Sequence, residues 1–173
     1  MQDLKVSIAQ ILGRPGESRD LRVGARIGEV HTELARLSDS PVEGHLRLDS
    51  VVEGVLVTGK LAADTVLTCA RCLTEIPAHS EVEVCELFAA PGHLPEEEEL
   101  YRIKGLEIDL EPMVRDALVL SLPLNPVCDT ECTGMCARCG RILPPGGRCE
   151  YCVDEAVDPR WAGLSALRGR LED

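Results

Sequence analysis

The stretch that decides the fold is PVEGHLRLDSVVEGVLVTGKLAADTVLTCARC, residues 41–72 of a chain of 173 residues. Apolar and polar residues alternate along it, as they do in strands with one buried face. Glycines interrupt it at short intervals, and short strands with tight connections favour an antiparallel meander. The stretch ends in the pair Cys69 and Cys72, so a strand leads directly into a candidate metal-binding turn.

The strand pattern continues on both sides of this stretch. Residues 4–8 alternate and predict a first strand, and further alternation follows as far as Phe88. Ahead of the central stretch, residues 13–28 are rich in Gly and Arg and predict a loop, whereas residues 30–37 predict a short helix. The sheet should therefore come mainly from the middle of the chain.

One helix is expected after the strands. Asp109 is placed to cap it, and Pro123 should end it. The apolar residues with a 3.6-residue period are Leu110, Met113, Val114, Ala117 and Leu118. The predicted fold class is α+β: an antiparallel β-sheet meander with one main packing helix, a small C-terminal cysteine-rich zinc ribbon and a short tail helix.

Composition divides the chain into three predicted segments. Residues 1–125 are expected to form the antiparallel α+β core with its N-terminal segment. Residues 126–157 are dense in Cys, Gly and Pro and should form a zinc-binding segment. Residues 158–173 predict an amphipathic tail whose apolar stripe includes Trp161. Within the core, PGHLPEEEE at 91–99 predicts a solvated loop.

The charge distribution limits the kinds of partner. The chain has 30 acidic and 18 basic residues, a net charge of −12, and residues 37–125 alone hold 17 acidic and 6 basic groups. This balance excludes a large phosphate-neutralising surface in the middle of the chain. Fifteen of the 18 basic residues are Arg, and basic surface is expected at the two ends of the chain.

Composition also bears on compartment. The first twelve residues contain no unbroken apolar run, and no stretch reaches the ~18 apolar residues of a membrane span. We therefore expect a cytoplasmic protein without membrane association, in a compartment that keeps thiols reduced. Nine cysteines in that setting indicate metal binding rather than disulfides. Only four residues are aromatic, which argues against a platform that stacks bases.

Eight of the nine cysteines form four closely spaced pairs. A short spacer lets one tight turn supply two thiolates to a tetrahedral zinc ion, so four pairs can build two closed sites. The predicted metal ligands are Cys69, Cys72, Cys128, Cys132, Cys136, Cys139, Cys149 and Cys152. Sites with four cysteine ligands leave no coordination position open, and the chain has no P-loop or GxGxxG motif, so we expect no enzyme.

Distance along the chain divides the pairs between the two sites. Nine residues separate Cys139 from Cys149, enough for a ribbon closed on itself. Fifty-five residues separate Cys72 from Cys128, so a site built from these pairs would join the sheet to the segment after the helix. Two other interpretations of the first pair stay open, a redox dithiol and two buried thiols. Cys85 lies in an alternating strand and is expected to be a small core residue.

The motifs resemble those of one known family. CARC follows a strand, and IDLEPMVRDALVLSLPLNPVC comes after it at 108–128. CTGMCARCG stands at 132–140 and DPRWAGLSAL at 158–167. Together they are similar to the YceD family of large ribosomal RNA subunit accumulation proteins, from about residue 51 to residue 167.

The resemblance carries expectations about function. It implies a bacterial or plastid protein that is needed for normal accumulation of large-subunit ribosomal RNA and has no established enzymatic activity. It also implies that the metal site shared across the family is formed by Cys69, Cys72, Cys128 and Cys132. The ribbon from Cys136 to Cys152 would then be an addition.

The implied partner is a large ribosomal subunit precursor or a basic ribosomal protein, with indirect or weak contact to ribosomal RNA. The acidic middle of the chain suits a basic protein, since opposite potentials speed encounter. Candidate partner-binding residues are Arg138, Arg141, Arg148, Trp161, Arg168 and Arg170. Two alternatives remain: a redox-regulated zinc-thiolate protein and a zinc-ribbon protein that binds RNA directly.

Overall fold

The computed structural model describes residues 4–92 and 101–152. Residues 93–99 of the predicted acidic loop and the predicted tail, including Trp161, Arg168 and Arg170, lie outside these ranges. Within the ranges, no helix is long and apolar enough to span a membrane.

The predicted α+β class is confirmed, because the described chain contains mostly antiparallel strands and one helix. The elements are β1 (Lys5–Ser7), β2 (Ser18–Ala25), β3 (Ala35–Leu37), β4 (Val42–Val51), β5 (Gly54–Thr68), β6 (Glu75–Ala89), β7 (Tyr101–Arg102), β8 (Glu107–Asp109) and α1 (Glu111–Ser121). The predicted strand at residues 4–8 is present as β1.

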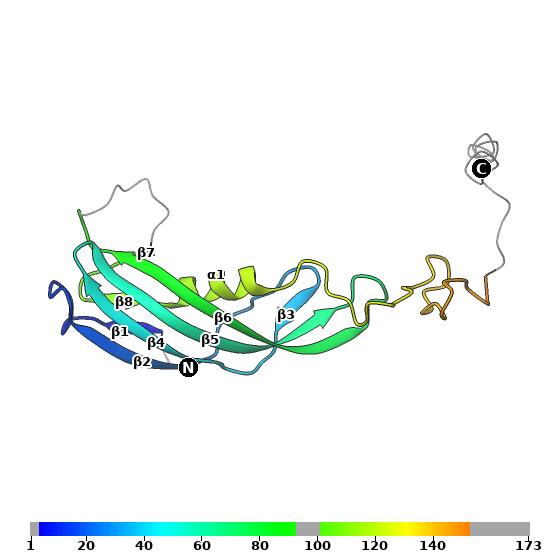
Figure 1. Ribbon diagram of the computed structural model, residues 1–173, viewed down its shortest axis with the longest axis horizontal. Coiled ribbons are helices and arrows are strands. Elements are labelled where there is room, and N and C mark those ends of the chain that lie inside the picture. Colours follow the sequence, from blue (N-terminus) through cyan, green and yellow to red (C-terminus); the bar gives the residue numbers. More distant parts are fainter. Residues whose placement is uncertain (1–3, 93–100, 153–173) are drawn as a thin grey trace, which may run out of the picture.

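The main sheet has the strand order β2-β4-β5-β6-β7, and β3 pairs with β5 beside it. Every pairing is antiparallel except that of β6 with β7. β1 and β8 form a separate antiparallel pair. Figure 1 shows a long, twisted sheet with α1 lying along it, and the cysteine-rich segment extends beyond the end where β5 turns into β6.

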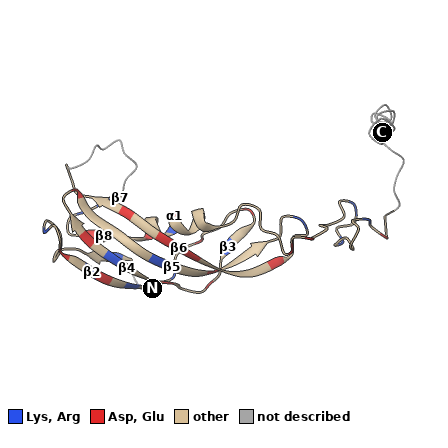
Figure 2. Ribbon diagram, in the orientation of Figure 1, with Lys and Arg blue, Asp and Glu red and all other residues tan. Residues whose placement is uncertain are grey.

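The two faces of the main sheet differ in polarity. In β4, Leu46 and Leu48 are buried, whereas His45 and Arg47 are exposed. Figure 2 shows charged residues spaced along the strands. This alternation is typical of an antiparallel sheet with one face in water.

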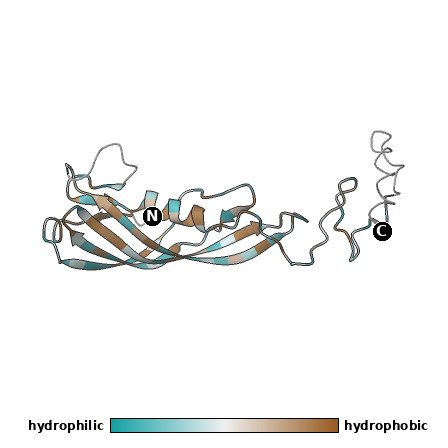
Figure 3. Cartoon of the chain, turned by 45° about the horizontal axis from the view of Figure 1, so that its top comes forward, coloured by the Kyte–Doolittle hydropathy of each residue, from teal (hydrophilic) through white to brown (hydrophobic). Residues whose placement is uncertain are grey.

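The apolar face is covered by α1 and by the β1–β8 pair. The buried cluster joins Leu48 and Phe88 of the sheet to Ile108 of β8 and Met113 of α1. Figure 3 shows hydrophobic and hydrophilic residues alternating along the strands. Each large apolar side chain that is fully buried contributes about 1.5–3 kcal/mol, so this layer is the main source of stability in the sheet.

The predicted helix is present as α1, but its N-cap is Leu110 and not the predicted Asp109. The Asp109 carboxylate accepts the backbone N–H of Glu111 at 3.1 Å, although Leu110 occupies the residue directly before the helix. The helix ends at Ser121, two residues before Pro123. The proline therefore ends the helix as predicted, since its ring prevents further helical hydrogen bonding.

Two of the local predictions are wrong. Residues 13–28 contain β2, which pairs with β4 along its whole length, and residues 30–37 end in β3, which pairs with β5. Residues 13–28 have few apolar residues because β2 buries one face at most. Leu21 and Val23 did alternate with charged residues, but the pairing partner that makes this a strand lies far along the chain.

The expectation of short strands between residues 54 and 89 is also wrong, because the strands there are long. β5 and β6 have 15 residues each and pair along their entire length. Gly59 does not interrupt β5. Its φ is +150°, and a Cβ there would lie 2.2 Å from the carbonyl oxygen of His45, so glycine lets β4 approach closely.

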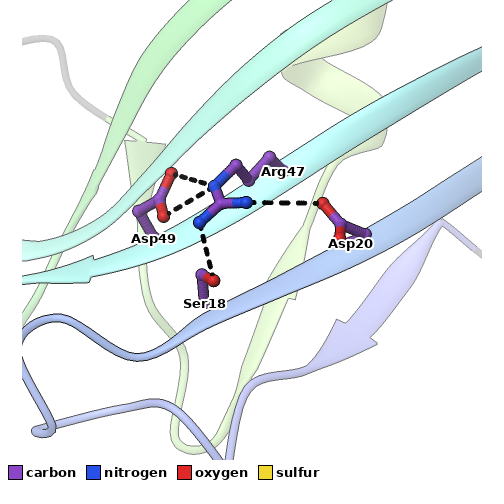
Figure 4. Close-up of polar contacts among 4 residues, drawn as sticks. All are labelled: Ser18, Asp20, Arg47 and Asp49. Carbon is purple, nitrogen blue, oxygen red and sulfur yellow. Dashed lines mark hydrogen bonds and ion pairs between the residues drawn. The ribbon is translucent and has the colours of Figure 1, made fainter.

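Arg47 joins three polar side chains on the exposed face of the sheet (Figure 4). Its Nε donates to both carboxylate oxygens of Asp49, at 2.9 and 3.2 Å, and its Nη2 donates to Ser18 Oγ at 2.8 Å. Asp20 lies at 4.0 Å from Nη1. Exposed ion pairs of this kind stabilise a fold by about 0–1 kcal/mol, so the cluster mainly ties β2 to β4.

Candidate metal centres

The first group of cysteines lies at the end of the β5–β6 hairpin. The Sγ atoms of Cys69 and Cys132 are 3.9 Å apart, and those of Cys72 and Cys128 are 3.6 Å apart. All four sulfur atoms lie within 4.8 Å of one another. Cys69 and Cys72 are buried, whereas Cys128 is exposed. The group therefore stands at the surface with its hairpin side enclosed.

Backbone contacts hold the two halves of this group together. The hairpin turn supplies Cys69 and Cys72, and its Ala70 N–H donates to the carbonyl oxygen of Pro126 at 2.8 Å. Arg71 Nη1 donates to the carbonyl oxygens of Thr130 and Cys132 at 3.1 and 2.9 Å. One guanidinium thus connects the hairpin to the segment that follows α1.

The second group is formed within a short segment. Cys136 and Cys152 have their Sγ atoms 3.8 Å apart, and Cys139 and Cys149 have theirs 3.6 Å apart. Again all four lie within 4.8 Å. The backbone of residues 134–143 doubles back on itself, with Met135 bridged to Ile142. The described contacts of this group are therefore local in sequence.

The sulfur positions fit a tetrahedral metal ion. A Zn–S bond of about 2.3 Å in a tetrahedral site places the sulfur atoms about 3.8 Å apart. The four separations given above, 3.6–3.9 Å, agree with this value. A disulfide would instead require about 2.05 Å. With four thiolates, the ion would have no open position for a substrate, so such sites hold structure.

Both groups are built on the same turn. Cys69 N–H donates to the Thr74 carbonyl at 2.9 Å, and Cys136 N–H donates to the Arg141 carbonyl at 2.8 Å. The residue after the second cysteine has a left-handed backbone in each case, with φ of 59° at Leu73 and 69° at Gly140. The two CARC motifs thus fold alike.

The turn also prepares one sulfur in each group to be a thiolate. The backbone N–H of Cys72 points at Cys69 and lowers the pKa of that thiol to about 6. In the same way, the N–H groups of Cys139 and Arg138 lower the pKa of Cys136 to about 6. Hydrogen bonds from backbone N–H groups favour the charged form, which is the form that binds metal.

The remaining thiols show why a cation suits these groups. Hydrogen bonds to the Cys132 and Cys72 sulfur atoms raise the pKa of Cys128 to about 12. Cys152 is affected in the same way by Cys139, and its pKa also rises to about 12. Four sulfur atoms this close cannot all be ionised side by side, because like charges oppose one another. A divalent cation at the centre removes that opposition.

The structure brings the eight predicted ligands together in the two groups that their spacing suggested. The prediction for Cys85 is wrong: it is exposed, on the polar face of β6 and opposite Thr58. Its position in the alternation gave a signal, because it shares a face with Glu81 and Glu83 rather than with Val82 and Val84.

The predicted partner-binding arginines of the ribbon are all exposed, namely Arg138, Arg141 and Arg148. Arg141 stacks on the Tyr151 ring, with its guanidinium carbon 3.8 Å from the ring centre. Tyr151 itself is 70% exposed. What these residues bind stays a prediction. The bridging role of Arg71 was not predicted, because nothing in a CARC motif says where its arginine will point.

Comparisons with known proteins agree with these motifs. The family model described as "Large ribosomal RNA subunit accumulation protein YceD" matches residues 57–168. The uncharacterized protein Rv2926c of Mycobacterium tuberculosis is 40% identical over 98% of this chain and 84% of its own length. The uncharacterized protein YlbN of Bacillus subtilis is 25% identical over 95% of this chain and 96% of its own length.

A plant relative carries a functional name. The chloroplastic large ribosomal RNA subunit accumulation protein YCED homolog 1 of Arabidopsis thaliana is 33% identical over 66 residues, which cover 38% of this chain and 20% of that protein. No solved structure matches.

Proposed function

This chain belongs to the YceD family, and from that premise we propose that it is a cytoplasmic, non-enzymatic, zinc-binding factor that supports accumulation of large-subunit ribosomal RNA. The observation that carries the proposal is the family match over residues 57–168, which includes both cysteine groups. The name of the family model suggests the biological process, and the sulfur geometry supports zinc as the cofactor.

Zinc would act here as a structural tie. The first site would fasten the end of the β5–β6 hairpin to the segment after α1, and the second would close the ribbon on itself. Cysteine thiolates are preferred zinc ligands, and a closed site of four has no position for water or substrate. The residues would thus hold a surface in shape rather than perform a reaction.

We propose a basic ribosomal protein, alone or within a large-subunit precursor, as the partner. The net charge is −12, and each filled four-cysteine site would add further negative charge. Such a protein attracts basic partners and repels bare RNA. Exposed Arg138, Arg141 and Arg148 on the ribbon support a secondary contact with RNA phosphate.

The cellular test is depletion of the protein followed by measurement of the ratio of large-subunit to small-subunit ribosomal RNA. We expect the ratio to fall, and the wild-type chain to restore it. Cys72→Ser should fail to restore it, whereas Cys85→Ser should succeed, because Cys85 is an exposed thiol outside both groups. A ratio that depletion leaves unchanged would overturn the proposal.

The biochemical test compares two purified ligands near physiological salt. We expect the zinc-loaded chain to bind basic proteins extracted from large subunits and to bind protein-free large-subunit RNA weakly, with affinity that falls steeply as salt rises. Nanomolar, salt-resistant binding to the bare RNA, with none to the proteins, would instead make this an RNA-binding zinc protein.

A further inference from the structure

Strand β6 forms an edge of the main sheet for most of its length. On one side it pairs with β5 from residue 75 to residue 89. On the other side β7 pairs only with Phe88 and Ala89. Among the strands that the structure describes, none pairs with residues 75–87 on that side. A long row of backbone groups is therefore left without a strand partner.

Two hydrogen bonds show which residues direct their backbone to this open edge. Ile103 N–H donates to the Ala89 carbonyl on the β7 side, at 3.0 Å, whereas Ala90 N–H donates to the Glu53 carbonyl on the β5 side, at 2.8 Å. The backbone N–H and C=O groups of successive residues point to opposite sides of a strand. The residues that face the open edge are thus the odd-numbered ones, His79, Glu81, Glu83, Cys85 and Leu87 among them.

Pro77 supports this assignment and limits the open row. It also belongs to the odd-numbered set, and it has no N–H to offer. Proline is tolerated within a sheet where its nitrogen faces away from a neighbouring strand. Proline at an edge also discourages unwanted pairing. The usable part of the edge therefore begins at His79.

The side chains beside the open row are acidic. β6 contains four glutamates and no lysine or arginine, and Figure 2 shows acidic residues at intervals along it. Glu81 and Glu83 lie on the polar face, and Glu83 is ion-paired with Lys60 at 2.8 Å. On the other face Glu86 is exposed, and Asp116 of α1 accepts the Tyr101 hydroxyl at 2.7 Å. Both faces of an added strand would thus meet carboxylates.

We propose that residues 79–87 of β6 bind an extended, basic segment of another protein as an additional strand. Main-chain hydrogen bonds to the odd-numbered residues would supply affinity, and the glutamates would select lysine and arginine side chains. This inference rests on the proposed function, and it names the surface on which a basic ribosomal protein is held.

A second copy of this chain suits the edge less well. The opposite edge, β2, carries Arg19 and Arg22, so one copy could meet the acidic edge of another. Such a contact is heterologous and leaves an unfilled edge at each end, so it would grow into open chains rather than a closed assembly. Growth of particle size with protein concentration, with no binding of basic peptide, would overturn the proposal in favour of this arrangement.

The direct test uses the full zinc-loaded chain and a ten-residue peptide of alternating lysine and valine. A second peptide has the same side chains but N-methyl groups on its central amides, so it keeps the charge and loses the backbone donors. We expect the first peptide to bind at least about tenfold more tightly, since only that peptide can donate its central backbone N–H groups to β6. Equal affinity of the two peptides would show that only charge contributes to binding. The proposal that the peptide pairs with the edge of β6 would then be wrong.

Variants at one position separate backbone from charge. Glu81→Pro removes an edge-facing N–H, as Pro77 already does nearby, and should weaken peptide binding about tenfold. Glu81→Ala removes only the charge and should weaken it about two- to threefold. Glu43→Ala, on the same face but in the interior strand β4, should leave binding unchanged. Thermal melting of each variant checks that the sheet is intact.

The same variants distinguish failure of this inference from failure of the proposed function. If the chain binds basic ribosomal proteins and Glu81→Pro does not weaken that binding, the partner lies elsewhere on the surface and only the edge assignment is wrong. If the peptide binds at the edge but depletion leaves ribosomal RNA levels unchanged, the edge stands and the proposed function falls.

Discussion

The two cysteine groups share a turn but differ in what they connect. In both, a CARC sequence forms a loop closed by a bond from the first cysteine N–H, and in both the next residue has a left-handed backbone. The group at Cys69 lies where the long β5–β6 hairpin meets the segment after α1, and Arg71 spans that junction. All four cysteines of the group at Cys136 lie between Cys136 and Cys152, so this group joins no distant parts of the chain.

This difference shows that two sites with identical ligands can contribute unequally to the stability of the fold. A site whose ligands are far apart in sequence restrains the relative positions of large elements, whereas a local site restrains only its own loop. The cost of losing a metal should therefore depend on the length of chain that the metal joins, and not on the chemistry of the four sulfur atoms, which is the same in both groups.

The largest expected effect comes from removing one ligand from each group. Cys72→Ser should destabilise the whole described fold, whereas Cys139→Ser should disturb only the ribbon. Structural zinc contributes roughly 10–16 kcal/mol of apparent binding energy in small peptides, and a typical domain is stable by only about 5–15 kcal/mol. Losing a fraction of that energy at the first group should lower the melting temperature of the sheet strongly.

Circular dichroism of the strands, followed during heating, measures this comparison. Cys85→Ser is the matched control, because it replaces an exposed thiol that belongs to neither group. An equal loss of thermal stability in Cys72→Ser and Cys139→Ser would contradict the idea that the two sites carry unequal weight.

Metal removal should show the same order without mutation. We expect two zinc ions per chain after purification without chelator. A chelator should release the ribbon ion first, because its ligands come from one local loop and only Cys136 among them is buried, while the first group has two buried ligands. Metal analysis and circular dichroism of the strands should show that the first zinc ion leaves without unfolding of the sheet. The second zinc ion should leave as the sheet unfolds. A ratio near one zinc ion per chain would show that one of the two cysteine groups does not bind zinc.

A smaller effect should follow from removing the guanidinium bridge. Arg71→Ala loses two hydrogen bonds to backbone carbonyls, at Thr130 and Cys132. Each is worth about 1 kcal/mol or less at an exposed position. Denaturant unfolding should therefore show a modest loss of stability, and chelator should release the first ion faster. Arg138→Ala, at the same place in the other CARC motif, should leave sheet stability unchanged.

Some of this arrangement follows from sequence rules. The grouping of the cysteines follows from spacing, since short spacers fit one turn and the ribbon pairs lie close in the chain. The helix follows from the 3.6-residue period and Pro123, although its N-cap is Leu110, one residue after the predicted Asp109. These signals are local, and local signals can be interpreted without knowing the rest of the fold.

What could not be predicted depends on contacts between distant parts of the chain. β2 and β3 are strands because β4 and β5 pair with them, whereas their own sequences predicted a loop and a short helix. The expected burial of Cys85 failed because its face is decided by the register of β6. Likewise, the sequence around Cys69 has no glycine after the second cysteine, so the left-handed turn there was visible only in the structure.

That missing glycine gives the last and smallest expected effect. Leu73 has φ of 59°, whereas Gly140 stands at the matching position of the other turn. A left-handed backbone costs a residue with a Cβ about 1–2 kcal/mol, and glycine costs about 0.5–1 kcal/mol in lost chain entropy. Since the Leu73 side chain is 53% exposed and loses little packing, Leu73→Gly should stabilise the fold by about 0.5–1 kcal/mol.

The reciprocal change tests whether the two turns are equivalent. Nothing lies within 4 Å of a Cβ built on Gly140, so Gly140→Ala adds backbone strain without a clash. It should weaken zinc binding at the ribbon about two- to fivefold and leave the melting temperature of the sheet unchanged. Isothermal denaturation and zinc competition measure the two quantities separately. If Leu73→Gly instead destabilised the sheet, the leucine side chain would have a packing role that outweighs its strain, and the two CARC turns would differ in more than the length of chain they join.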